Sequence, residues 1–120
     1  MTIQKLINKV QEEKPNTFED EKILSFINEI EADVAEELKT EKPNYTISDM
    51  AVEMLAPAPY DRLYVSYVKA MIDYANEEYP SYQLNAEQHS VDFRDFADWV
   101  VRESMAAETK IPRRFVHTMY

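Results

Sequence analysis

The chain contains no glycine, and this absence restricts its folds and sites more than any other feature of its 120 residues. Average proteins contain roughly 7% glycine. Walker A loops, dinucleotide-binding fingerprints and nucleophile elbows need glycine for tight turns or for close approach of the backbone to a ligand. These three kinds of enzyme site are therefore excluded. Proline and asparagine are expected to end the helices instead, and prolines stand at positions 15, 43, 57, 59, 80 and 112.

Charge and hydropathy indicate one acidic, soluble domain. The length fits a single domain, and a composition of 45% hydrophobic and 30% charged residues is that of a globular protein. A net charge of −10 disfavours general binding to nucleic acid phosphates or to anionic lipid. No apolar run reaches the ~18–20 residues of a membrane span, and the N-terminus lacks the apolar core of a signal peptide. We therefore expect no membrane contact.

Apolar side chains recur at helical intervals in four segments, which predicts an all-α fold, a small bundle of about four helices. Thr2 and Thr17 are expected to cap the first two helices, and Pro59 to be the first residue of the third. The fourth helix should begin near Ser81 or Asn85. The predicted helices span residues 2–13, 18–39, 60–78 and about 81–105.

Aromatic residues concentrate in the last two predicted helices. Nine of the fourteen aromatic side chains lie between residues 60 and 99. Most of them are expected in the core, because tyrosine at helical spacing usually packs its ring and leaves its hydroxyl at the edge. The predicted inward faces include Tyr74 in the third helix and Phe96 and Val101 in the fourth. The remaining aromatic side chains are expected on the surface, for contact with a partner.

Two parts of the chain do not follow the helical pattern. Residues 40–59 are predicted to be irregular, and the sequence leaves open whether 44–56 is extended or helical. Ser48 is expected to cap a short helical turn there. The second part is the C-terminal segment, residues 106–120.

The residues before that segment are expected to form a single helical domain. Residues 1–105 hold 10 basic and 22 acidic side chains, a net charge of −12.

The last fifteen residues differ in charge from the body. Residues 106–120 hold three basic side chains against one acidic side chain, a net charge of +2, and they contain Pro112. We expect this segment to be a flexible or partner-docked tail. Its predicted docking residues are Lys110, Arg113, Arg114, Phe115 and Tyr120.

No constellation of residues predicts catalysis or metal binding. The chain has no cysteine, and His89 lacks the glutamate three residues earlier that a di-iron helical bundle requires. Asp92, Asp95 and Asp98 recur every third residue, and we interpret this row as a solvated stripe rather than a cation site. We therefore predict no catalytic, cofactor-binding or metal-binding residue, and no enzyme activity.

The sequence between residues 54 and 104 resembles the small head–tail connector proteins, also called adaptor or neck proteins, of tailed phages and prophages of Gram-positive bacteria. The resemblance consists of a Pro-x-Pro-Tyr-Asp lead into a tyrosine-rich helix, an Asn-x-Glu-Tyr turn and an aromatic fourth helix. Pro80 and Gln83-Leu84 depart from the asparagine-rich turn expected there. The residues that carry the motif are Pro57, Pro59, Tyr60, Asp61, Tyr64, Tyr67, Asn76, Glu78, Tyr79 and Tyr82.

The resemblance implies a structural role in the virion, with assembly in the host cytoplasm. Such proteins form a ring beneath the portal, extend the DNA channel and bind the portal and a downstream neck or tail protein. An acidic body suits a channel through which DNA passes without specific binding. Asp61 is expected at a helix N-terminus, where the dipole favours its charge, and Pro57 and Pro59 are expected to fix the angle at which the chain enters that helix. The tail is expected to dock on the portal.

The alternative function is that of an acidic DNA mimic, or another mobile-element interaction protein that inhibits a host DNA-binding protein. Residues 17–41 hold nine acidic side chains and two lysines, a local charge of −7. In a mimic, these carboxylates would replace the phosphates of DNA. We interpret this segment as the acidic face of the molecule.

Overall fold

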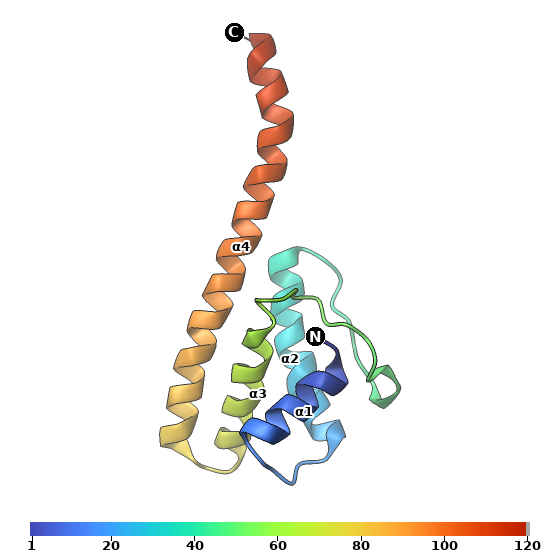
Figure 1. Ribbon diagram of the computed structural model, residues 1–120, viewed down its shortest axis with the longest axis vertical. Coiled ribbons are helices and arrows are strands. Elements are labelled where there is room, and N and C mark those ends of the chain that lie inside the picture. Colours follow the sequence, from blue (N-terminus) through green and yellow to red (C-terminus); the bar gives the residue numbers. More distant parts are fainter. Residues whose placement is uncertain (120) are drawn as a thin grey trace.

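The computed structural model describes the backbone of residues 1–119 and the side chains of residues 1–107. The described chain forms four α-helices, one short 3-10 helix and no strand, so the predicted all-α bundle is confirmed. Helix α3 contacts each of the other three α-helices, and α4 packs along its length (Figure 1). The elements are α1 (Ile3–Glu13), α2 (Asp20–Leu38), η1 (Ile47–Asp49), α3 (Arg62–Ala75) and α4 (Tyr79–Met119).

One hydrophobic core joins the first three helices to the lower half of α4. Tyr64 and Phe96 are the largest fully buried side chains in the described part of the chain, and they come from the facing helices α3 and α4. Burying a large apolar side chain contributes about 1.5–3 kcal/mol, so these contacts determine how the helices pack. The apolar stripes predicted for α1 and α2 lie in this core, which contains Ile3, Leu6, Val10, Ile23, Ile27, Ile30 and Val34.

The helix caps follow the prediction in α1 but not in α2. The Thr2 hydroxyl accepts a hydrogen bond from the Lys5 backbone N–H, as predicted. The prediction of Thr17 as a cap is wrong, because Glu19 occupies the N-cap position of α2. Asn16 organises the preceding turn instead: its side chain accepts from the Phe18 N–H at 3.1 Å and donates to the backbone carbonyl of Lys14 at 3.0 Å.

Two helix ends use left-handed residues other than glycine or asparagine. Lys39 ends α2 with φ of 56°, and Glu77, after α3, has φ of 58°. A left-handed conformation costs a residue with a Cβ roughly 1–2 kcal/mol relative to the right-handed one. The prediction that proline and asparagine end all helices is therefore wrong for α2, whose C-cap is Lys39, whereas α3 has Asn76 as its C-cap, as the prediction expects.

The segment between α2 and α3 is irregular, as predicted, with η1 as its only helical turn in the described structure. Thr46, rather than the predicted Ser48, caps η1 through a capping box with Asp49. Thr2 forms a β-bridge with Glu53, which fastens the segment to the start of α1. Helix α3 begins at Arg62, so the prediction of Pro59 as its first residue is wrong. The Tyr60 N–H donates to the Pro57 carbonyl and closes a turn before the helix.

Helix α4 is longer than predicted at both ends. It begins at Tyr79, so neither Ser81 nor Asn85 is its first residue. Pro80 lies in the first turn, where a missing N–H breaks no intrahelical hydrogen bond. The backbone stays helical to Met119, well beyond the predicted end near residue 105, and gives the molecule its longest extent of 63 Å (Figure 1). We call residues 106–119 the arm.

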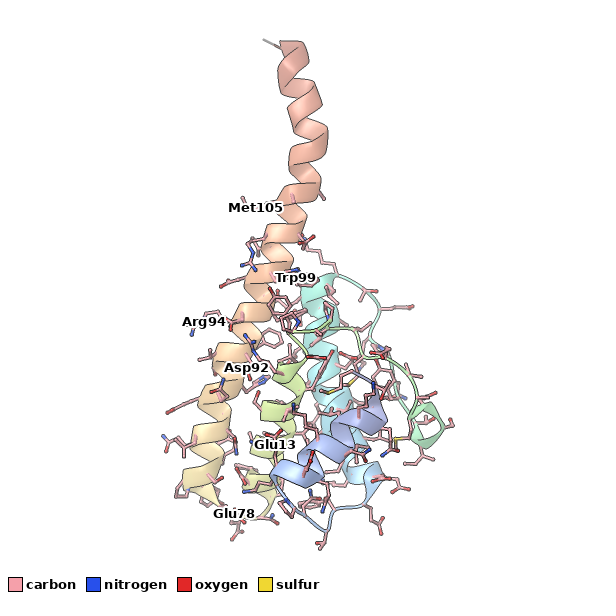
Figure 2. The ribbon with its side chains drawn as sticks, in the orientation of Figure 1. Glu13, Glu78, Asp92, Arg94, Trp99 and Met105 are labelled. Carbon is pink, nitrogen blue, oxygen red and sulfur yellow. The ribbon has the colours of Figure 1, made fainter. Side chains whose placement is uncertain are left out.

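Two side chains that were expected in the core lie on the surface. Tyr74 is 58% exposed and lies one residue before the C-terminal end of α3. Val101 is 52% exposed, in the stretch of α4 between Trp99 and Met105 where this helix leaves the bundle (Figure 2). Both predictions of burial are therefore wrong.

Candidate functional site

The ten residues of the connector-like motif do not form one site. Pro57, Pro59, Tyr60 and Asp61 precede α3, whereas Asn76, Glu78, Tyr79 and Tyr82 surround its other end. Helix α3 has 14 residues, so the two groups are about 20 Å apart at 1.5 Å per residue. Figure 2 shows this separation, with Glu78 at the lower end of the bundle and Trp99 near the base of the arm. Tyr64 and Tyr67 lie on α3 between the two groups.

The motif residues that precede α3, which we call the upper motif group, support the base of the arm. The ring of Tyr60 stacks on Trp99 of α4, with centroids 5.3 Å apart. The Tyr60 hydroxyl also accepts a hydrogen bond from the Arg102 guanidinium at 3.3 Å. These contacts hold α4 in place where it leaves the bundle, and so fix the direction of the arm.

Asp61 stands at the N-cap position of α3, as predicted, but its side chain makes no capping hydrogen bond. Its carboxylate lies 3.4 Å from the ammonium group of Met1, which also binds Glu53 at 2.8 Å. The hydrogen bond to Glu53, with a further contribution from Asp61, raises the pKa of the Met1 ammonium. Asp61 therefore joins the start of α1 to the start of α3. Pro57 and Pro59 are exposed beside it.

The motif residues around the other end of α3, which we call the lower motif group, form an exposed tyrosine cluster together with Tyr74 at the turn between α3 and α4. The ring of Tyr74 lies 6.1 Å from that of Tyr79 and 5.3 Å from that of Tyr82. Tyr79 is 54% exposed, and the neighbouring Asn76 and Glu78 are also on the surface. This cluster provides the surface aromatic groups that the sequence predicts for contact with a partner.

A buried ion pair holds the α3–α4 turn in place behind the tyrosine cluster. Asp73 of α3 is fully buried and pairs with the ammonium group of Lys14. It also accepts hydrogen bonds from the Ser81 hydroxyl and the Asn85 amide of α4, each at 2.7 Å. Burial alone would raise the pKa of Asp73, but the hydrogen bonds from these three partners hold it below its ordinary value. Asp73 therefore links α3 to α4 and to the end of α1.

The lowered pKa of Asp73 predicts a loss of stability in acid. A carboxylate with a lower pKa in the folded state stabilises the protein above its unfolded pKa, near 3.9, and this stabilisation is lost as pH falls through the folded pKa. We expect Asp73→Asn to cost about 2 kcal/mol at pH 7 and to weaken the dependence of unfolding on pH below about 4. Urea titrations between neutral and acid pH measure both effects. Asp98→Asn, on the exposed face of α4, is the control. An Asp73 variant as stable as this control would contradict the prediction.

A second buried carboxylate, Glu31, lies at the centre of the core. It is fully buried and accepts hydrogen bonds from the hydroxyls of Tyr45 at 2.6 Å and Tyr64 at 2.5 Å, and from the Leu55 N–H at 3.0 Å. Burial raises the pKa of both tyrosines, so their hydroxyls keep the protons that they donate. The Tyr64 hydroxyl accepts in turn from the Ala56 N–H. Glu31 therefore fastens the irregular segment onto α2 and α3.

Sequence reasoning placed Glu31 on the acidic face, and this assignment is wrong. The position follows the helical spacing of Leu24, Ile27, Val34 and Leu38, so the helical repeat already places it on the buried stripe of α2. A charged residue in phase with an apolar stripe is the signal that would have identified it.

An open groove lies between α2 and α4, with a volume of about 470 Å³. The carboxylates of Asp33, Glu36 and Glu37 line its α2 side, and no ion pair to them is formed by the described side chains. Its α4 side carries Phe93 and His89 together with Ser90 and Arg94. We call this the acidic groove.

His89 makes the floor of the acidic groove uncharged at neutral pH. Its ring lies between those of Tyr67 and Phe93, with centroids 5.1 and 5.8 Å away, and its Nδ1 atom is 3.0 Å from the Leu63 carbonyl oxygen. Burial lowers the pKa of His89 below its ordinary value. The carboxylates of α2 therefore dominate the charge of the groove.

A smaller hollow of about 280 Å³ lies at the next position toward the arm. It shares Glu37 with the acidic groove, and its other lining residues are Lys39 and Ser104 together with the apolar Leu38, Val100, Val101 and Met105. The two hollows are neighbours through Glu37, and we call them together the α2–α4 groove, acidic at one end and mostly apolar at the other. Val101 and Met105 are exposed and line the apolar end. Figure 2 shows Met105 where α4 leaves the bundle.

The row of aspartates on α4 is not the solvated stripe that the sequence predicts. Asp92 is 3% exposed and lies 3.3 Å from Nε of Arg62, and Asp95 binds the same guanidinium at 2.7 Å. Two of the three aspartates therefore connect α4 to the start of α3. Only Asp98 is exposed.

Within the part of the chain that the structure describes, no three His, Asp or Glu side chains are arranged to hold a metal ion. None of the described helices combines the length and apolarity needed to cross a membrane. The predicted docking side chains Lys110, Arg113, Arg114 and Phe115 lie outside the described side chains, and Tyr120 lies outside the described backbone.

Comparison with protein-family models, curated proteins and solved structures finds no significant match to this chain. Three surface features of the molecule are therefore the candidates for a functional role: the tyrosine cluster, the α2–α4 groove and the arm.

Proposed function

We propose that this protein is a head–tail connector subunit, a structural phage protein that assembles as a ring beneath the portal and extends the DNA channel. The observation that best supports an assembly role is the length of α4. This helix has 41 residues and therefore spans about 60 Å, and beyond Met105 it runs clear of α1, α2 and α3 (Figure 1). Most of the stability of a protein helix comes from packing against other elements, so a helix that extends beyond its bundle suits contact with a second molecule.

The surface of the bundle also supports this proposal. The exposed tyrosine cluster and the α2–α4 groove are separate surfaces suited to contacts with neighbours, since tyrosine is frequent at binding hot spots. The body of the molecule, residues 1–105, carries a charge of −12. A wall of this charge lets DNA pass because it offers few cations to its phosphates.

The acidic DNA mimic has less support. A mimic needs its carboxylates on one exposed face, but Glu31 of the acidic segment is buried and hydrogen-bonded. Arg94 also lines the groove in which three of the remaining carboxylates lie. A phosphate-like array would have neither feature.

The test is a pull-down of the tagged protein, read by mass spectrometry, from host cells that are producing the virus particles. We expect to recover the portal and a neck or tail protein together with untagged copies of the chain. The same body with residues 106–120 removed is the matched control. Recovery of a restriction enzyme, polymerase or repressor without virion proteins would overturn the proposal in favour of the mimic.

A further inference from the structure

We propose that the α2–α4 groove of one copy receives the basic end of the arm, residues 110–116, of the next copy in the ring. This inference names the partner surface for the assembly proposed above, and it rests on that proposal.

The charge of the groove calls for a cationic partner. Three carboxylates, those of Asp33, Glu36 and Glu37, line its acidic end against one cation, Arg94, and none of the described ion pairs joins them to a basic side chain. Three carboxylates on a concave surface produce a negative potential that a basic segment would neutralise. The apolar end of the same groove, beside Val101 and Met105, would accept apolar side chains.

The chain itself contains a segment with this combination. Residues 110–114 hold three basic side chains and no acidic one, the densest cluster of positive charge in the sequence. Phe115 and Val116 follow directly. A basic stretch next to two apolar residues therefore matches a groove that is acidic at one end and apolar at the other.

The arm does not reach its own groove. Helix α4 forms one wall of that groove with residues 89–105 and then continues as a helix away from the bundle (Figure 1). Returning to the groove would require a reversal of the chain, and the helix has none. A second copy is therefore the source of the occupant.

The symmetry of such a contact fits a ring. The groove and the arm are different surfaces of one molecule, so a contact between them is heterologous. Repeated heterologous contacts generate a closed ring when the rotation between copies closes, and an open helical array when it does not. A contact between two identical surfaces would stop at a dimer.

Cysteine pairing tests the contact directly, because the natural chain has no cysteine that would react in its place. One purified population carries Glu36→Cys in the groove, and a second carries Arg114→Cys in the arm. Copper phenanthroline with dissolved oxygen is the oxidant in every mixture, so oxygen accepts the two electrons and two protons that the thiols lose as the disulfide forms. Docking raises the effective concentration of the two thiols, so we expect their mixed disulfide to form about tenfold faster or more than in the control. The control replaces Glu36→Cys by Glu12→Cys, another exposed glutamate, on α1. Equal rates in the two mixtures would overturn the inference.

Two further variants test the role of charge and the course of the arm. In the charge test, Asp33→Cys supplies the thiol in the groove, and Glu36→Lys and Glu37→Lys reverse the charge around it. The disulfide with the arm should then form more slowly. Adding Arg113→Glu to the partner that carries Arg114→Cys should restore the rate. A chain carrying both Glu36→Cys and Arg114→Cys should form a ladder of covalent oligomers, and an internal disulfide in a monomer would overturn the inference. These measurements use the purified protein alone, so their failure is distinguishable from the absence of virion proteins in the pull-down.

Discussion

Replacing Glu31 by Ala is expected to lower the free energy of unfolding by about 3–5 kcal/mol, the largest effect of any single substitution of an acidic residue in this protein. The substitution removes the acceptor of two buried hydrogen bonds, from Tyr45 and Tyr64, and of a part-buried one from the Leu55 N–H. Each unpaired buried donor costs about 1–3 kcal/mol. Urea unfolding followed by circular dichroism measures the change.

Two controls separate the network from a general effect on α2. Glu36→Ala removes an exposed carboxylate from the same helix, and we expect a change within about 0.5 kcal/mol. Glu31→Gln should be intermediate, because the amide oxygen still accepts but its NH₂ group faces a donor. If Glu31→Ala unfolds at the same urea concentration as Glu36→Ala, the buried network does not stabilise the irregular segment.

Removing residues 106–120 is expected to reduce binding to DNA-filled heads to background while the body stays folded. The described core residues all lie at or before Val100, so the truncated chain keeps its core and should retain a cooperative thermal transition. The variant loses the three basic side chains of the tail and most of the length by which α4 extends beyond the bundle. Co-sedimentation with heads that carry a portal but no connector measures the binding.

A full-length variant serves as the matched control for the truncation. Replacing Lys110, Arg113 and Arg114 by Gln keeps the chain length and removes the charge, and we expect it to bind heads more weakly than the natural chain. Normal binding by the truncated chain would contradict the role that we assign to the arm. Loss of its thermal transition would instead show that the arm belongs to the folded body.

The sequence predicts the helices well because their apolar stripes are local patterns. The spacing of Ile23, Ile27, Ile30 and Val34 fixes both the type of element and its buried face, and the structure confirms both. The capping of α1 by Thr2 is equally local. Fold class and most of the core therefore follow from patterns within a few turns of helix.

The sequence predicts the polar junctions poorly because their partners are far apart along the chain. Glu31 and Tyr64 are 33 residues apart, and Arg62 and Asp95 are also 33 residues apart. Asp73 and Lys14, which form an ion pair, are 59 residues apart along the chain. Burial of these charges is decided by packing between helices, which periodicity within one helix does not reveal.

The α2–α4 groove could be predicted only in part. Its acidic wall follows from the local charge of residues 17–41, but its position against Phe93 and His89 depends on how α4 crosses α2. The sequence does not predict the length of α4, because Pro80 and Pro112 both indicate breaks and the helix contains both of them. Pro80 instead falls in the first turn, where it is tolerated.

Cryo-electron microscopy of the portal vertex tests the central claim most directly. DNA-filled heads that lack the connector are incubated with the purified protein and imaged beside heads without it. We predict a ring of additional density beneath the portal, into which copies of the four-helix body fit with α4 of each copy reaching the next. A portal vertex that is identical with and without the protein would contradict the assignment as a connector subunit.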